Sequence, residues 1–276
     1  MRTRVLTGAA IVVPAFYLLG WSPKWLFLLV MIVIVERGLY EYILIAQKSG
    51  IDFLAAAGYA GGAALCVLQW AALRYSEVIE FAGLIALLVL IPSVSLWRVR
   101  ELKRYLACSA ATTFGIYYVA FGLSCLFPLR FGGLGSGLAD GRDIVFFLFI
   151  VVSGGDIFAY FTGRLFGHRP MFHRVSPKKT MEGSLGGLIA SLVLGWAYAQ
   201  WFWRTKDTAV ILVLALVVAI AGQIGDLAES AMKRGADMKD SGALLPGHGG
   251  LLDRVDSLLF GAPVLWLALE LRNLIH

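Results

Sequence analysis

Side chains that can hold metal ions and phosphates gather near the C-terminal end of the sequence, between two apolar runs. Four polar residues there are spaced i, i+3, i+7 and i+10, so a helix that continues through them would carry all four on one face: Gln223, Asp226, Ser230 and Lys233. Asp253 and Asp256 are spaced i, i+3, and in a helix these two carboxylates would also share a face. We expect the pair to meet Asp226. Three converging carboxylates would suit a divalent cation.

Glycines directly precede the paired acids, in the order His248, Gly249, Gly250. Because glycine has no Cβ, backbone N–H groups at these positions could approach phosphate oxygens closely. The alternative is a solvated loop followed by an acidic first turn, which the helix dipole favours. A solvated loop has no need of this glycine pair, so the whole string favours a phosphate site.

A further acid, Asp156, lies inside an apolar run. An acid in a membrane helix costs at least about 2.5 kcal/mol on insertion scales, so such residues usually face a cavity. A helix–helix hydrogen bond or a pairing with arginine is the structural alternative. Lys178 and Lys179 follow in the next polar segment, where the tendency of cytoplasmic loops to collect lysine would explain them equally well.

The composition indicates which elements position these residues. Of 276 residues, 59% are hydrophobic and 15% are charged, whereas soluble domains carry about 25% charged residues. The predicted fold class is an all-α, polytopic integral membrane protein with about nine transmembrane helices and the active segment between the last two. We expect about five of these helices in residues 1–143 and the catalytic region in residues 144–276, within one structural domain.

Apolar segments of the right length can be marked along the whole sequence. The segment 25–46 is the weakest, because Glu36, Arg37 and Glu41 interrupt its apolar face, and an interfacial helix is the alternative there. The predicted segments are 5–20, 25–46, 51–72, 78–97, 107–129, 144–163, 184–203, 208–228 and 252–271.

Positive charge predicts the orientation of these segments. Most of the 24 lysines and arginines fall on one set of alternate connectors, which places the N-terminus and the active segment in the cytoplasm and the C-terminus outside. The net charge of +6 follows this topology, so anionic lipid and bound phosphates explain it better than nucleic acid, for which no motif is present. The three cysteines stand alone in apolar segments and predict no metal site or redox pair.

The polar stretch as a whole resembles the signature of the phosphatidate cytidylyltransferase family. It fits the pattern S-x-x-K-R-x4-K-D-x5-P-x-H-G-G-x-x-D-R-x-D without departure at a fixed position. The matching residues are Ser230, Lys233, Arg234, Lys239, Asp240, Pro246, His248, Gly249, Gly250, Asp253, Arg254 and Asp256.

A second block, around residues 153–183, resembles the upstream region of that family. Ile157 and Phe158 replace the small or hydroxyl residues expected after the acid, and Met181 stands where tryptophan is usual, so the shape of the pocket departs from the family pattern here. The matching residues are Asp156, Arg164, Ser176, Lys179 and Thr180.

The resemblance implies transfer of the cytidylyl group from CTP to phosphatidic acid in the bilayer, with Mg²⁺ as cofactor and room for a second, monovalent cation. It also implies a bacterial inner-membrane enzyme and a homodimer. Metal binding is expected of Asp226, Asp253 and Asp256, and phosphate neutralisation of Lys233, Arg234, Lys239 and Arg254. His248 is expected to donate to the leaving pyrophosphate, and Gly249 and Gly250 to admit backbone donors. The remaining substrate-binding candidates are Asp156, Arg164, Ser176, Lys179, Thr180 and Ser230.

Two other functions stay open at this point. A CTP-dependent polyprenol kinase of similar topology would release CDP rather than pyrophosphate. A transporter could use the intramembrane acids to carry ions, but it would not need the His-Gly-Gly-x-x-Asp-Arg-x-Asp string.

Overall fold

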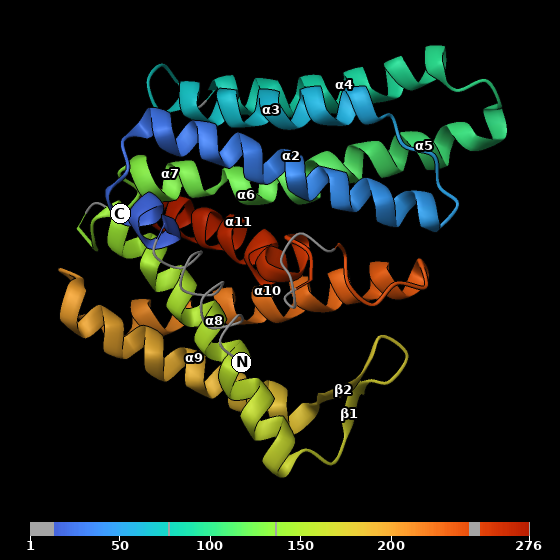
Figure 1. Ribbon diagram of the computed structural model, residues 1–276. Helices are drawn as coiled ribbons and strands as arrows, with labels where there is room; N and C mark the ends of the chain where they lie inside the picture. Colours follow the sequence, from blue (N-terminus) through green and yellow to red (C-terminus); the bar gives the residue numbers. More distant parts are fainter. Residues whose placement is uncertain (1–13, 77, 136, 243–248, 276) are drawn as a thin grey trace. The chain divides into compact units, whose positions relative to one another are not determined.

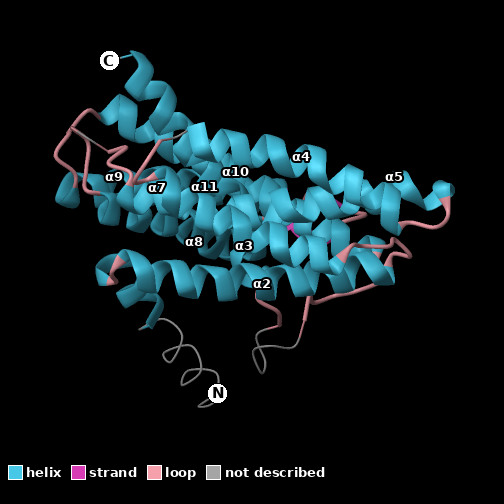
Figure 2. Cartoon of the chain, turned by 90° about the horizontal axis from the view of Figure 1, so that it is seen from above, coloured by secondary structure: helices cyan, strands magenta, loops and turns pink. Residues whose placement is uncertain are grey.

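The computed structural model describes residues 14–76, 78–135, 137–242 and 249–275, and nearly all of them are helical (Figures 1 and 2). These residues form two compact units whose segments alternate along the chain. The first unit takes the described residues within 14–18, 22–127 and 232–254, and the second takes those within 19–21, 128–231 and 255–275. Each unit is therefore built from three segments that are separated in the sequence.

The first unit is a bundle of long helices. It contains α2 (Lys24–Lys48), α3 (Ala55–Ala72), α4 (Val78–Arg98) and α5 (Leu102–Gly115), which continues through a π-helical turn, η1 (Ile116–Phe121), into α6 (Gly122–Ser124). Helix α3 contacts α2, α4 and η1. The buried centre of the unit includes Phe27, Leu39, Leu65 and Val119, each at most 1% exposed.

The second unit carries a small hairpin among its helices. Helix α7 (Leu126–Phe131) enters the second unit. Helix α8 (Gly141–Phe166) follows, and after it come the antiparallel strands β1 (Pro170–Phe172) and β2 (Ser176–Thr180). Helix α9 (Met181–Phe202) follows, together with most of α10 (Thr208–Gly235) and of α11 (Leu252–Ile275). The hairpin was not predicted, because β1 has only three residues and the five residues of β2 are mostly polar and carry no alternating pattern.

Small residues let α8 and α9 pack closely. A Cβ atom at Gly187 would lie 2.8 Å from both the Cβ of Ala159 and the carbonyl oxygen of Gly155, so only glycine fits at this crossing. One turn further along α9, Ser191 is buried and its hydroxyl donates to the carbonyl oxygen of Val151 at 2.8 Å. Close approach through glycine and a serine hydrogen bond is typical of helix pairs in membranes.

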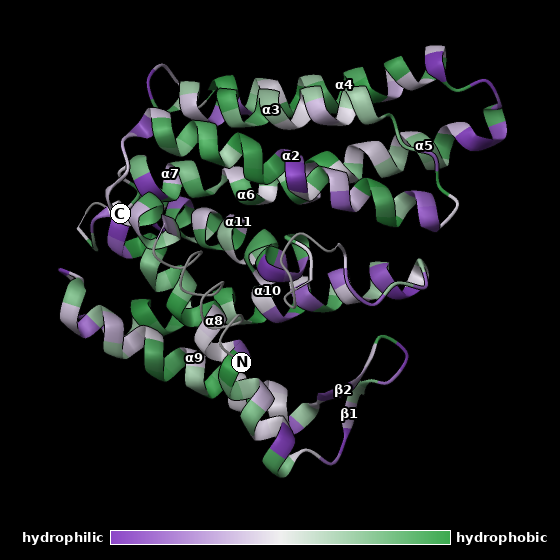
Figure 3. Ribbon diagram, viewed as in Figure 1, coloured by the Kyte–Doolittle hydropathy of each residue, from purple (hydrophilic) through white to green (hydrophobic). Residues whose placement is uncertain are grey.

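The helices have the length and apolar surface that a membrane requires. Among the described residues, six helices are long and apolar enough to cross it by length and composition: α3, α4, α8, α9, α10 and the continuous helical stretch Leu102–Phe131. Figure 3 shows α4 hydrophobic along most of its length and α10 becoming hydrophilic toward its C-terminal end. Side chains such as Leu88 and Val89 on α4 are more than half exposed, as expected of a surface that faces lipid.

The all-α, polytopic fold class predicted from the sequence is confirmed, whereas the count of nine helices stays a prediction. Helix α2 is continuous over the weak segment 25–46 but is not among the six, and neither is α11. Helix α10 is longer than the predicted segment 208–228, since it continues to Gly235. The predicted first segment, 5–20, lies mostly outside the described residues.

Candidate active site

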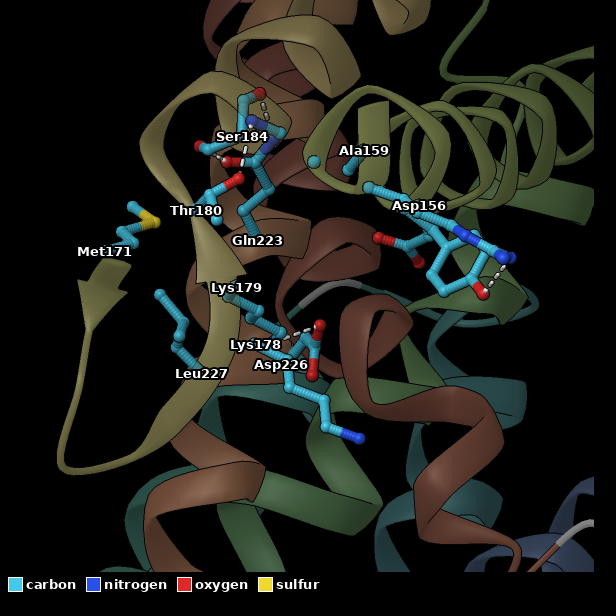
Figure 4. Close-up of a pocket in the computed structure, with 14 residues that line it drawn as sticks. Asp156, Ala159, Met171, Lys178, Lys179, Thr180, Ser184, Gln223, Asp226 and Leu227 are labelled. Carbon is cyan, nitrogen blue, oxygen red and sulfur yellow. Dashed lines mark hydrogen bonds and ion pairs between the residues drawn. The ribbon is translucent and has the colours of Figure 1, made fainter. Parts of the chain in front are cut away.

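A cavity of about 550 Å³ opens in the second unit between α8, β2, α9 and α10. Its polar lining includes Asp156 and Arg164 from α8, Lys179 and Thr180 from β2, and Asp226 from α10. In Figure 4 the carboxylates of Asp156 and Asp226 point into the same space, with Lys179 beside Asp226. Five site residues predicted from separate parts of the sequence therefore line one cavity.

An ion pair joins the hairpin to α10 inside this cavity. The ammonium group of Lys179 contacts the carboxylate of Asp226, and both side chains are about a third exposed or less. The next residue, Thr180, is the N-cap of α9: its hydroxyl oxygen accepts a hydrogen bond from the backbone N–H of Gly183 at 3.1 Å. Such an N-cap fixes the direction in which the helix leaves the strand, and it thereby fixes Lys179.

Glu182, in the first turn of α9, contacts the chain segment that precedes β1. Its carboxylate accepts hydrogen bonds from the backbone N–H groups of His168 at 3.1 Å and Arg169 at 3.2 Å. The chain segment that enters β1 is thus tied to the first turn of α9. Sequence reasoning did not find this role, because only the fold brings the two segments together.

Two further polar residues of the cavity were not assigned to the site from the sequence. The hydroxyl group of Ser184 on α9 donates to the side-chain oxygen of Gln223 on α10, and the amide nitrogen of Gln223 donates to the carbonyl oxygen of Ser184 at 3.0 Å. The helical spacing of Gln223 and Asp226 was the one signal in the sequence that placed Gln223 on the reactive face. Its reciprocal pairing holds α9 and α10 together beside the reactive acid.

Three acids of the second unit come from different helices and repel one another. Asp156 and Asp226 interact unfavourably, and Asp256 on α11 does so with both of them and with the buried Glu229. Asp156 accepts a hydrogen bond from the hydroxyl group of Ser257 at 3.3 Å. The concentration of negative charge suits a bound cation, because a cation would relieve the repulsion.

In the described part of the chain, no group of three or more histidine, cysteine, aspartate or glutamate side chains is arranged to hold a metal ion. In nucleotide sites Mg²⁺ is usually held by one or two carboxylates together with phosphate oxygens and water. The oxygen donors of Asp226 and Asp256 fit that chemistry.

Asp253 belongs to a separate cluster in the first unit, where protein groups surround its carboxylate. One oxygen pairs with the ammonium group of Lys233, and both side chains are about 10% exposed. The other oxygen accepts from the backbone N–H groups of Gly250 at 2.8 Å and Ser241 at 2.9 Å. Gly249 has a φ of 79°, in the left-handed region that glycine adopts without strain. Asp253 thus anchors the glycine segment.

The sequence is similar to those of known proteins. The sequence profile of the cytidylyltransferase family matches residues 2–272. The chain belongs to the cytidylyltransferase family. A phosphatidate cytidylyltransferase of Staphylococcus aureus (strain COL) is 30% identical over 268 residues, which are 96% of this chain and 97% of that protein.

Other relatives carry the same name. The phosphatidate cytidylyltransferase of Staphylococcus epidermidis (strain RP62A) is 33% identical over 218 residues, which are 78% of this chain and 80% of the relative. That of Bacillus subtilis (strain 168) is 42% identical over 131 residues, so this match spans 48% of the chain and 49% of the relative.

The remaining predicted residues of this cytidylyltransferase have varied surroundings. Arg234 is exposed and donates to the carbonyl oxygen of Met238 at 3.1 Å, and Arg164 donates to the hydroxyl group of Tyr160 at 3.4 Å. His248 lies outside the described residues. Lys239 and Arg254 are exposed, Ser176 and Ser230 are half-buried, and Lys178 lines the cavity beside Lys179.

Proposed function

We propose that this cytidylyltransferase transfers the cytidylyl group from CTP to phosphatidic acid, releasing pyrophosphate and leaving CDP-diacylglycerol in the bilayer for phospholipid biosynthesis. The observation that carries the proposal is the cavity in which Asp156, Lys179 and Asp226 meet among membrane-spanning helices. The names of the relatives support the same reaction.

The cavity suits a lipid phosphate. Its cationic groups, Arg164, Lys178 and Lys179, can neutralise phosphate oxygens, and its neighbouring helices offer apolar surface on which acyl chains can lie. Its volume of about 550 Å³ is within the usual range for small-molecule sites. A lipid headgroup could therefore enter from the membrane while the nucleotide enters from water.

The chemistry requires positioning and charge neutralisation more than proton transfer. An oxygen of the lipid phosphate attacks the α-phosphorus of CTP, and the bond from that phosphorus to the pyrophosphate oxygen breaks. The nucleophile is already ionised at neutral pH, because the second pKa of a phosphate monoester is about 6. Lys179 is placed to hold a phosphate oxygen where it now holds Asp226. No covalent enzyme intermediate is needed.

Mg²⁺ would be held by Asp226 and Asp256, with Asp156 adding negative charge nearby. Once bound, the ion would supply neutralisation of the triphosphate and of the charge that develops on the leaving pyrophosphate. In its absence Lys179 offsets part of the charge of Asp226. The exposed Arg234, Lys239 and Arg254 are further candidates for neutralising nucleotide phosphates.

The proposed location is the bacterial inner membrane, with the site facing the cytoplasm. The arginines and lysines of the hairpin and of residues 233–254 support this side, because positive charge is retained in the cytoplasm. The three relatives named above are bacterial proteins. A homodimer rests on the family resemblance and can be checked by the mass of the detergent-solubilised protein.

One incubation separates the candidate functions. The purified protein, in vesicles that contain both phosphatidic acid and a polyprenol, receives CTP labelled in its cytidine, and the lipid and the released phosphates are then analysed. Cytidylyl transfer gives labelled lipid and an equal amount of pyrophosphate, whereas a kinase gives labelled CDP and no labelled lipid. An ion transporter gives neither product and would overturn the proposal.

A further inference from the structure

Glu41 is a buried acid in an otherwise apolar helix. It lies on α2, its side chain is fully buried, and the sequence signature contains no part of α2. A buried carboxylate is unfavourable unless it is paired and hydrogen-bonded. The contacts of Glu41 show which groups provide that compensation.

The partners of Glu41 lie some 200 residues further along the chain, at the start of α11. One carboxylate oxygen accepts from the backbone N–H of Leu251 at 3.0 Å, and the other accepts from that of Leu252 at 2.9 Å. The second oxygen also accepts from the hydroxyl group of Ser241 at 2.8 Å. Arg37, one turn earlier on α2, balances the charge at 3.2 Å.

Glu41 and Asp253 hold the same short segments. The hydroxyl group of Ser241 lies between them, 2.8 Å from Glu41 and 3.1 Å from Asp253. Two glycines make room for the carboxylate of Glu41: a Cβ atom at Gly242 would lie 2.8 Å from one of its oxygens, and a Cβ atom at Gly250 would overlap the other. The segments on both sides of residues 243–248 are therefore built around Glu41.

We propose that Glu41 is a positioning residue for cytidylyl transfer. It fixes Ser241, the glycine segment and the first turn of α11, and through them it sets the place of the Lys233–Asp253 pair. This inference rests on the proposed function. It gives α2 a role in the reaction that neither its apolar sequence nor the signature motif indicates.

The two oxygens of Glu41 explain why glutamine cannot replace it. The backbone N–H of Leu251 and that of Leu252 donate to different oxygens of the carboxylate. Glutamine has one acceptor oxygen, so its NH₂ group would face a donor in either orientation. Aspartate keeps both oxygens and the charge but is shorter by one methylene group, so it should restore part of the effect.

The test compares Glu41→Gln, Glu41→Asp and the control Glu36→Gln in the full-length protein. Glu36 lies on the same helix and faces α3, where a Cβ atom at Gly62 would lie 3.5 Å from one of its carboxylate oxygens, so it tests the same chemical change without touching the glycine segment. Rates are measured at saturating CTP and phosphatidic acid, per amount of folded protein. We expect Glu41→Gln to lower kcat by about tenfold to a hundredfold, because small misplacements of a reactive group have effects of this size. Aspartate should recover part of the loss, and Glu36→Gln should stay within twofold of wild type.

Amide hydrogen exchange provides a readout that a general loss of stability would not move. In Glu41→Gln the amides of Leu251 and Leu252 should exchange faster, while those of α3 and α4 keep their protection. A kcat within twofold of wild type, an equal loss in Glu36→Gln, or faster exchange across the whole first unit would overturn the role of Glu41. An inactive wild type would overturn the proposed function instead.

A double substitution gives an independent check. Ser241→Ala removes the hydroxyl group that lies between Glu41 and Asp253, so Ser241→Ala and Glu41→Gln should weaken the same arrangement. We expect the double variant to lose less activity than the product of the two single losses, because the residues act as one unit. A loss equal to that product would show that they act separately and would overturn the proposal.

Discussion

The two acids Asp253 and Asp256 should respond in opposite ways to the same substitution by asparagine. Asp253 forms a nearly buried pair with Lys233, and both side chains are about 10% exposed. Removal of one partner from a buried ion pair usually costs about 3–5 kcal/mol, since the other charge is left without compensation. Asp256 is repelled by Asp226, Glu229 and Asp156, so loss of its charge removes an unfavourable interaction.

These surroundings set the expected magnitudes. At the lower figure of about 3 kcal/mol, Asp253→Asn should lower the Tm by about 6–12 °C, on the scale that applies to chains of this size. Asp256→Asn should leave the Tm unchanged or raise it. Its activity should still fall about a hundredfold or more, because the loss of a metal-held phosphate clamp removes several kcal/mol of transition-state stabilisation.

The assay combines thermal unfolding in lipid nanodiscs with pyrophosphate release at several Mg²⁺ concentrations. The matched control is the double variant Lys233→Met, Asp253→Asn, which removes both charges and should recover part of the lost stability. If Asp253→Asn unfolded at the wild-type temperature, the buried pair would not be stabilising. Near-normal activity of Asp256→Asn at limiting Mg²⁺ would refute its assignment to the metal.

Four further outcomes are expected. Lys179→Met should lower the rate of pyrophosphate release at least about tenfold, whereas Lys179→Arg should retain part of it, because the site requires a cation beside Asp226. Equal rates in both variants would contradict this requirement. Asp156→Asn should lower turnover without lowering the Tm, because the acid lines the cavity; the reverse result would indicate a purely structural hydrogen bond with Ser257. Removal of Mg²⁺ with a chelator should abolish product formation, and re-addition should restore it; undiminished labelled lipid in the chelator would argue against a metal. A reporter fused after His276 should lie outside the cell and one within residues 98–104 in the cytoplasm, and placement of both on one side would show that a span was miscounted.

Local sequence patterns predicted the helices and the signature, because both depend on residues that are close along the chain. The spacing of Gln223, Asp226 and Lys233 would place them on one face if the eighth helix continued through them, and α10 includes all three residues. The signature from Ser230 to Asp256 predicted the family, which the family comparison confirms. The isolated Asp156 predicted a cavity by the cost of burying an acid in a membrane, and the residue lines one.

Tertiary structure alone decided which charges meet. From the sequence, Asp253 and Asp256 were equivalent metal ligands, yet Asp253 is enclosed by Lys233, Ser241 and Gly250, whereas Asp256 repels the acids of α8 and α10. The hairpin that brings Lys179 to Asp226 depends on Glu182, whose partners, the backbone N–H groups of His168 and Arg169, precede β1. Nothing in the apolar segment around Glu41 explained why an acid stands there. Its hydrogen-bond partner Ser241 lies 200 residues further along the chain. Periodicity and motifs indicate the chemistry of a segment. The partner of a buried charge is set by packing between segments that are distant in sequence, so that partner can be identified only in the folded chain.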